Sequence, residues 1–313
     1  MNNIINLFED VKTPDYGLAD FDIDQAPLTY ITEDGVKKAS KHVIYRTDTG
    51  EELGIHGSRY SDLYDLSYKR MIDNQRDCIN KSGLDLGGLS EDIQVSHNGA
   101  KCFVRHTLPD VKLRTPDGDQ AALTFLTVSS LDGTFPFIST TGANQSACMN
   151  GQVFTNGAAT MYKSRHTKKL DVDHAAKIMY QAVDIFKDEV DKWFVWSEIG
   201  VHNMDAFFAF AKAANANAVF AWRKEYPTSP ISEMLLQPKI YSNTALMYMW
   251  DKYTTHYSKK MGTNQWAVYN TLTDWSTHAP AARESSQVNI ASISYKRGET
   301  VRDTIISNFR EAA

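Results

Sequence analysis

The pattern of apolar and polar positions divides the chain into a strand-rich first half and a helix-rich second half. Alternation with a period of two marks strands in the first half, and apolar residues at steps of three and four mark helices in the second. The pattern predicts an α+β fold: an antiparallel β-meander packed on a long helix and followed by a mostly helical second half.

Turn residues define the hairpins of this meander. Asn98-Gly99 is the strongest short hairpin signal in the chain, because both positions of such a turn favour a positive φ. Asp132-Gly133 marks a second hairpin, and Pro136 places its strand at a sheet edge because proline cannot donate to the ladder. About four antiparallel strands are expected, with the strand-like runs at 93–97, 101–106, 123–128 and 135–138.

Other elements surround the meander. A strand at 41–46 returns through 52–55, and a helix is predicted over 60–81, with Ser61 as its N-cap and Gly83 as its stop. The strongest helical period begins at Asp171, a predicted N-cap, and continues to 194. The remaining predictions are helices at 204–222, 242–261 and 264–277, a strand at 288–293, and a terminal helix from Thr300.

Three segments follow from these elements: an acidic, partly flexible segment at 1–34, a β-rich core at 35–200 that includes the helix at 171–194, and a helical region at 201–313 packed on that core. The net charge of the whole chain is −5, and residues 1–34 hold eight acidic residues against one lysine. Such a segment can keep the protein soluble, or it can compete with nucleic acid for a basic surface.

The most informative charge pattern is an acid-free stretch from Gly133 to Leu170 that ends in a basic run. Cations and hydroxyls contact phosphates, and a tyrosine ring can stack on an unpaired base. Alternation also places Lys101 and Arg105 on one face of their strand. The candidate nucleic-acid-binding residues are Lys101, Arg105, Arg114, Tyr162, Lys163, Arg165, His166, Thr167, Lys168 and Lys169.

Two weaker patterns compete with this interpretation. The basic run can simply be a solvated face beside a helix start. A second basic patch, close to the C-terminal end of the sequence, is diluted by acidic neighbours and is a poorer candidate. It consists of Lys296, Arg297, Arg302 and Arg310, interleaved with Glu299, Asp303 and Glu311.

Signatures of enzymes, cofactors and metals are absent from the sequence. It has no phosphate-binding Walker loop, no dinucleotide-binding glycine motif, no nucleophile elbow and no His-Glu-x-x-His. His202, Asn203 and Asp205 begin a predicted helix, where capping is the commoner role. We therefore expect no enzymatic activity, no cofactor and no metal. Three dispersed cysteines, no signal peptide and no apolar stretch of membrane length indicate a cytoplasmic protein without a membrane partner.

Several segments resemble an uncharacterised family carried by phages and plasmids, the phage/plasmid-like protein domain of unknown function. They are Leu126–Thr134, Gln145–Asn150, Arg165-His166-Thr167 and Trp266–Thr273. The family usually has an arginine where Gln145 or Ser146 stands here, so a phosphate contact of that arginine would pass to Lys163 or Arg165. The resemblance implies a role in the DNA metabolism of mobile elements. The predicted sheet followed by a long helix is also similar to the core of single-strand annealing proteins.

These observations predict a phage single-stranded DNA-binding protein that promotes strand annealing and recombination without ATP. The strand would lie in a groove between the sheet and the helix at 171–194. The resemblance implies a homo-oligomeric ring or filament in the cytoplasm of the host cell. One alternative is a host-takeover or anti-defence protein that acts through its acidic N-terminal segment. The other is an unrecognised nuclease or nucleotide-modifying enzyme.

Overall fold

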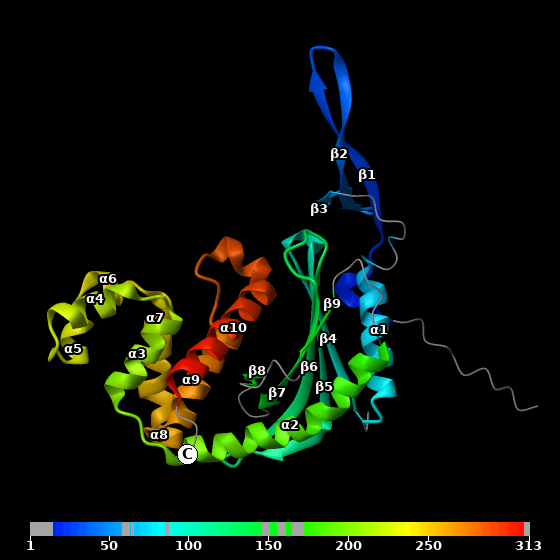
Figure 1. Cartoon of the computed structure of the whole chain (residues 1–313). Coiled ribbons are helices and arrows are strands. Elements are labelled where there is room, and N and C mark those ends of the chain that lie inside the picture. Colours follow the sequence, from blue (N-terminus) through cyan, green and yellow to red (C-terminus); the bar gives the residue numbers. More distant parts are fainter. Residues whose placement is uncertain are drawn as a thin grey trace, which may run out of the picture.

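The computed structural model describes residues 15–57, 63, 66–84, 88–145, 151–154, 161–164 and 172–309. An antiparallel sheet stands at the centre, with helices on both of its faces and a long hairpin that projects from one end (Figure 1). Its strand order is β4-β5-β6-β7-β8, and β9 also pairs with β7. The strands are β4 (Ser90–Ser96), β5 (Lys101–Arg114), β6 (Gln120–Ser130), β7 (Phe137–Gln145), β8 (Gly151–Val153) and β9 (Tyr162–Ser164).

The predicted meander is confirmed as β4 to β7. The tight turn between β4 and β5 contains Asn98 at φ 57° and Gly99 at φ 99°, the positive values that the sequence led us to expect. The edge position predicted from Pro136 is wrong. Pro136 precedes β7, and β7 is paired with β6 on one side and with β8 and β9 on the other, so the proline never has to donate to the ladder.

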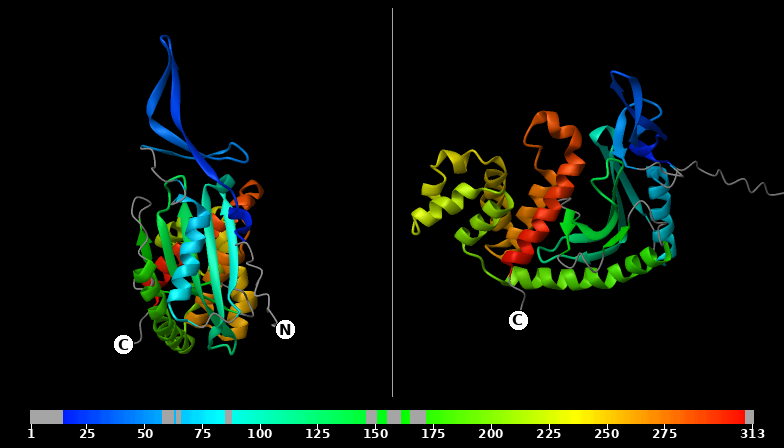
Figure 2. Two further views of the ribbon diagram at one scale, coloured as in Figure 1. Left: turned by 90° about the vertical axis from the view of Figure 1, so that its right-hand side faces the viewer. Right: turned by 45° about the horizontal axis from the view of Figure 1, so that its top comes forward.

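One face of the sheet is covered by α1 (Tyr68–Lys81) and α2 (Val172–Glu198) (Figure 2). The N-cap of α1 is Ser67, whose Oγ accepts a hydrogen bond from the amide of Arg70. This helix therefore begins later than predicted, and Ser61 lies outside the described residues. Gly83, at φ 73°, follows its last turn as expected. The predicted N-cap of α2, Asp171, is likewise outside the described residues.

A second, smaller sheet forms the projecting hairpin. Its strands are β1 (Ile23–Thr32), β2 (Gly35–Arg46) and β3 (Glu52–His56), in that order. The strands at 41–46 and 52–55 were expected, but β1 was not, because it lies in the acidic segment. β3 attaches this sheet to the central one. The His56 ring nitrogen Nε2 lies 2.6 Å from the carbonyl oxygen of Leu131, and the backbone of Gly54 lies directly against Leu131.

The other face of the central sheet looks onto the helical half of the chain. The elements are α3 (Asn203–Ala213), α4 (Asn217–Glu225), α5 (Ile231–Met234), α6 (Pro238–Tyr241), α7 (Thr244–Lys252), the π-helical turn η4 (Tyr253–Tyr257), α8 (Ser258–Met261), α9 (Gln265–His278) and α10 (Ile290–Asn308). α10 stands nearest to the sheet (Figure 1). None of the helices in the described part of the chain is long and apolar enough to span a membrane.

Two predictions for this half need correction. The helix expected at 204–222 is two helices, because Asn215 adopts a left-handed conformation at φ 51° between α3 and α4. The strand expected at 288–293 is wrong, because Ile290 starts α10 and Ile293 follows one helical turn later. An apolar run of this length does not by itself distinguish a strand from a helix.

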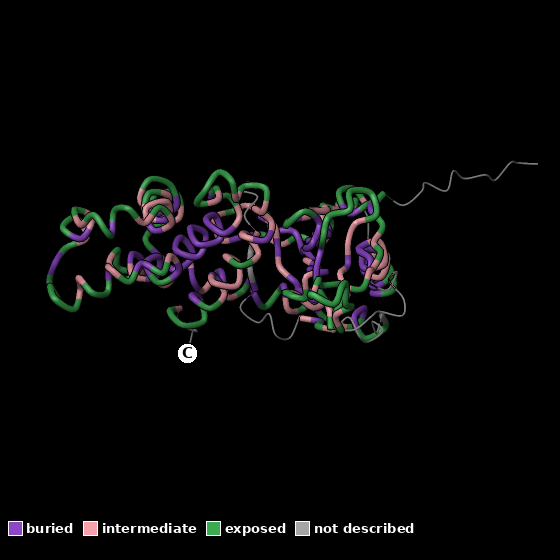
Figure 3. The backbone as a smooth tube through the Cα atoms, turned by 90° about the horizontal axis from the view of Figure 1, so that it is seen from above, coloured by how far each residue is buried: buried purple, intermediate pink, exposed green. Residues whose placement is uncertain are grey.

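α2 joins the two halves. Along its first turns Ala175, Met179 and Phe186 are buried. Near its end Trp193 stacks on Trp266 of α9, with ring centroids 5.3 Å apart. α9 is buried around its whole circumference from Gln265 to Ser276. The core therefore continues from the sheet into the helices, and buried backbone is visible in both halves (Figure 3).

Gly54→Ala tests how the hairpin sheet attaches. A Cβ at this position would overlap the carbonyl oxygen of Leu131 and the Cα of Asp132, both of them backbone atoms. We expect the substitution to lower the free energy of unfolding by about 1–3 kcal/mol, measured by urea denaturation. Gly57→Ala is the matched control, because a Cβ there meets nothing within 4 Å. Equal stability of the two variants would contradict the described contact.

Glu91→Gln tests a polar cluster beneath α1. Glu91 accepts hydrogen bonds from Arg76 and contacts His106 Nε2 at 2.7 Å. Burial raises the pKa of Glu91, but the hydrogen bonds from His106 and Arg76 outweigh it and lower this pKa from 4.5 to about 2. The stabilisation is therefore complete above pH 4.5 and disappears as the pH falls towards 2.

We expect Glu91→Gln to lower the free energy of unfolding at pH 7 by about 3 kcal/mol. Between pH 4.5 and pH 2 the variant should lose less stability than the wild type, because it lacks the titrating group. Urea unfolding followed by circular dichroism at several pH values measures both effects. Glu198→Gln, at an exposed position, should follow the wild type. Parallel acid profiles for Glu91→Gln and the wild type would contradict this assignment.

Candidate functional site

The face of the central sheet that looks onto α10 borders a cavity of about 270 Å³. The strands β4 to β7 form one wall, and α10 with the end of α9 forms the other. The cavity thus lies on the opposite side of the sheet from α1 and α2. Among the side chains that line it are Asp92, Arg105, Tyr295, Glu299 and Arg302.

The strand register explains which side chains reach the cavity. Arg105 on β5 is opposite Asp92 on β4 and Leu126 on β6, and all three line the cavity. Their neighbour His106 points to the other face and is fully buried there. The predicted alternation along β5 is therefore confirmed, and it divides this strand into a cavity face and a core face.

Arg105 is the most unusual charged residue of the site. Its guanidinium forms no hydrogen bond and no ion pair within the part of the chain that the structure describes, although its surroundings are largely closed to solvent. Burial lowers the pKa of Arg105, and the Asp92 carboxylate opposes this shift. The side chain nevertheless stays charged at neutral pH. A charged group without hydrogen-bond partners is costly in such a place, so it indicates a ligand site.

Arg302 faces the same cavity from α10. Its Nη1 atom forms an ion pair with the Oε1 atom of Glu299 at 2.9 Å, and only 14% of its side chain is exposed. Its Nε atom is buried and has no hydrogen-bond partner. The neighbouring Arg297 has a different role, because it donates to the carbonyl oxygens of Ala279 and Pro280 beyond the end of α9.

Aromatic rings form part of the cavity wall. Phe103 on β5 and Tyr295 on α10 have ring centroids 6.0 Å apart, and both pack against Phe135. Burial and the nearby Glu299 raise the pKa of Tyr295 to about 12, although Arg302 acts in the opposite direction. The hydroxyl of Tyr295 is therefore protonated at neutral pH and can donate a hydrogen bond.

Two of the predicted binding residues have structural contacts instead. Lys101 is buried, forms an ion pair with Asp132 at 3.4 Å, and lies over the ring of Phe135. Tyr162 is buried on the core face of the sheet, where its ring packs against Phe137 and against His174 of α2. Neither side chain presents a free surface to a strand of nucleic acid in this structure.

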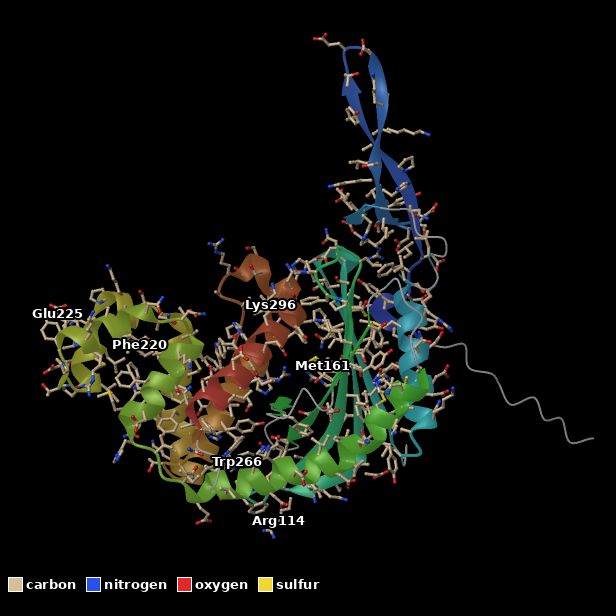
Figure 4. The ribbon with its side chains drawn as sticks, viewed as in Figure 1. Arg114, Met161, Phe220, Glu225, Trp266 and Lys296 are labelled. Carbon is tan, nitrogen blue, oxygen red and sulfur yellow. The ribbon has the colours of Figure 1, made fainter. Side chains whose placement is uncertain are left out.

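Lys163 is exposed and lies on the cavity face. It pairs with Ile138, which the register places on the same face as Phe103. Arg114 is also exposed, but it lies at the far end of β5, nine residues or roughly 30 Å from Arg105 (Figure 4). The structure thus brings Arg105 and Lys163 onto one surface and leaves Arg114 apart. The other predicted residues, Arg165, His166, Thr167, Lys168 and Lys169, lie outside the described residues.

The predicted position of the groove, between the sheet and the helix at 171–194, is wrong. α2 packs directly on the sheet through buried side chains such as Met179 and Phe186. The cavity is found on the other face, under α10. The charge pattern did not point to this face, because Arg302 belongs to a patch that its acidic neighbours make almost neutral.

Metal-binding residues do not gather in the described ranges, where no group of three or more histidine, cysteine or acidic side chains could hold an ion. His202 occupies the N-cap position of α3 without a side-chain capping bond. Cys78 and Cys102 are both buried, and burial raises the pKa of Cys102. Both are therefore expected to be poor nucleophiles. Cys148 lies outside the described residues.

A family model described as "Domain of unknown function (DUF932)" matches residues 53–294. The chain belongs to this family. No curated protein and no solved structure matches it. The matched range begins within β3, so β1 and β2 precede the DUF932 region, and it ends before Glu299 and Arg302. The phage or plasmid origin and the likeness to annealing proteins stay predictions.

Arg105→Leu tests whether this side chain serves the fold or a ligand. Because Arg105 has no partner among the described residues, we expect the free energy of unfolding to stay the same or to rise by about 1 kcal/mol. Arg76→Leu is the matched control. Arg76 donates twice to Glu91, so its loss should cost about 3 kcal/mol. Thermal and urea unfolding give both values. A large loss of stability in Arg105→Leu would mean that the role of Arg105 is structural.

Proposed function

We propose that this DUF932 protein binds single-stranded DNA across the cavity face of its central sheet and promotes strand annealing without ATP. One observation carries the proposal: Arg105 and Lys163 lie on the same face, and neither has a carboxylate partner at ion-pair distance among the described residues. Lys163 is also the first cation of the basic run that continues to Lys169. Unpaired cations on one surface attract a polyanion.

The surface of α2, on the opposite side of the molecule, is acidic and would repel a negatively charged strand. The outer surface of α2 exposes more acidic than basic side chains. The acidic ones are Asp173, Asp184, Asp188, Asp191 and Glu198, and the exposed lysines are Lys177 and Lys187. A phosphate chain would be repelled there and attracted to the other face. The distribution of charge therefore favours the face that carries Arg105 and Lys163.

The separation of the two cations suits a strand that crosses the sheet. Lys163 on β9 and Arg105 on β5 are three strand spacings apart, which is roughly 14 Å. That length covers about four phosphates at the spacing of one strand in B-form DNA. Contacts to the backbone leave the base edges free to pair with a complementary strand, and annealing requires such free edges. Assembly into a ring or filament stays a prediction, which light scattering with an added oligonucleotide tests.

Fluorescence polarisation with a labelled single-stranded oligonucleotide tests the proposal over a range of salt concentrations. The logarithm of the association constant should fall linearly with the logarithm of salt concentration. Lys163→Ala and Arg105→Gln should each make this slope shallower by about 0.7, because each removes one phosphate contact. The control is Lys187→Ala on α2, which should keep the slope of the wild type.

Several results would contradict this assignment. Binding that does not depend on salt would exclude a contact with the phosphate backbone. Equal slopes for Lys163→Ala, Arg105→Gln and the wild type would mean that the strand binds to another surface. A strand-annealing assay with the same variants then separates annealing from binding alone. ATP is left out of every reaction, so any annealing observed does not require it.

The alternative that acts through the acidic segment has less support. Asp20 and Asp22 both form ion pairs with Lys69 of α1, at 3.0 and 2.9 Å. These carboxylates are therefore already engaged within the molecule. A variant in which the other six acidic residues of this segment are replaced by their amides distinguishes the two functions; they are Glu9, Asp10, Asp15, Asp24, Glu33 and Asp34. DNA binding should persist or strengthen under our proposal, whereas a partner that recognises the acidic segment would be lost.

A further inference from the structure

We infer that the cavity between the sheet and α10 binds the phosphate monoester of one nucleotide. This group can come from a free nucleotide or from the phosphorylated end of a strand. The second source rests on the proposed function, since it requires that the protein binds DNA. The first source does not, because a free nucleotide would occupy the cavity whether or not a strand crosses the sheet.

The two arginines provide the argument from charge. Arg105 reaches the cavity from β5 and Arg302 from α10, so the positive groups lie on opposite walls. The only partner of Arg302 among the described residues is Glu299, which is bound at Nη1 and leaves the buried Nε atom without an acceptor. Arg105 has no acceptor at all in the described part of the chain. Guanidinium groups recognise phosphate through paired N–H donors.

A monoester fits this pair better than a phosphodiester. At neutral pH a phosphate monoester carries a charge of about −1.5 to −2 and offers three strong acceptor oxygens. A diester within a strand carries a single negative charge and must continue in both directions. The nearby carboxylates of Asp92 and Glu299 offset part of the positive charge, so the preference rests on the three acceptor oxygens, which two guanidinium groups can share.

Size and lining extend the inference from a phosphate to a nucleotide. A volume of about 270 Å³ lies just below the range of roughly 300–1,000 Å³ that is typical of small-molecule sites. This volume limits the ligand to about one nucleotide and is too small for a run of several. Phe103 and Tyr295 offer aromatic surface, and the hydroxyls of Thr124 and Thr140 lie on the sheet wall. An inorganic anion would use only the arginines.

The experiment compares probes that differ only in the phosphate group. Isothermal titration calorimetry measures a nucleoside 5′-monophosphate, the nucleoside alone and inorganic phosphate. Fluorescence polarisation measures single-stranded oligonucleotides with a 5′-phosphate, with a 3′-phosphate, or with hydroxyls at both ends. The variants are Arg105→Gln and Arg302→Gln. Arg283→Gln, at an exposed position outside the cavity, is the matched control.

A preference of tenfold or more for a phosphorylated end, lost in both cavity variants and kept in Arg283→Gln, would support the strand end as the source. Binding of the monophosphate but not of the nucleoside, with equal affinities for all three oligonucleotides, would support the free nucleotide. The inference is overturned if no probe gains affinity from its monoester, or if the gain survives both Arg105→Gln and Arg302→Gln. The proposed function would still stand in that case if the oligonucleotides bind in a salt-dependent manner.

Discussion

The arrangement of this protein depends on one helix that carries a single core from the sheet into the helical half. α2 has 27 residues, so it is about 40 Å long. Its first half buries an apolar stripe against the sheet, and Trp193 near its other end stacks on α9. Because a single rigid helix holds both halves, it fixes the distance of α9 and α10 from the sheet. The width of the cavity is a consequence of that distance.

The central sheet divides its tasks between its two faces. Along β5, Cys102, Val104 and His106 are buried in the core, whereas Phe103 and Arg105 look onto α10. The core face supplies the apolar burial that stabilises the fold. The cavity face can then carry a guanidinium that costs stability, and a local departure from good packing of this kind is typical of a functional site.

Local patterns in the sequence were sufficient for much of the fold. The Asn98-Gly99 turn, the alternation along β5 and the period of α2 depend on near neighbours in the chain, and all three were predicted. The strand β1, the break at Asn215 and the helical state of 288–293 were missed, because each depends on tertiary context or on one left-handed residue. Of the candidate site, the sequence patterns singled out Arg105 and Lys163, and their role stays a prediction. Arg302 is harder to recognise from sequence, because Glu299, one turn earlier on the same helix, makes the local charge almost neutral.

The two ends of β5 are each tied to the helical half. At one end the amide of His97 donates to the Oδ1 atom of Asn289, just before α10, at 2.8 Å. At the other end Lys260 of α8 donates to Asp117 in the turn after β5, at 2.9 Å. These two hydrogen bonds close the space between β5 and the helical half at both ends of the strand. A polymer on this face would therefore have to run perpendicular to the β-strands and not along them.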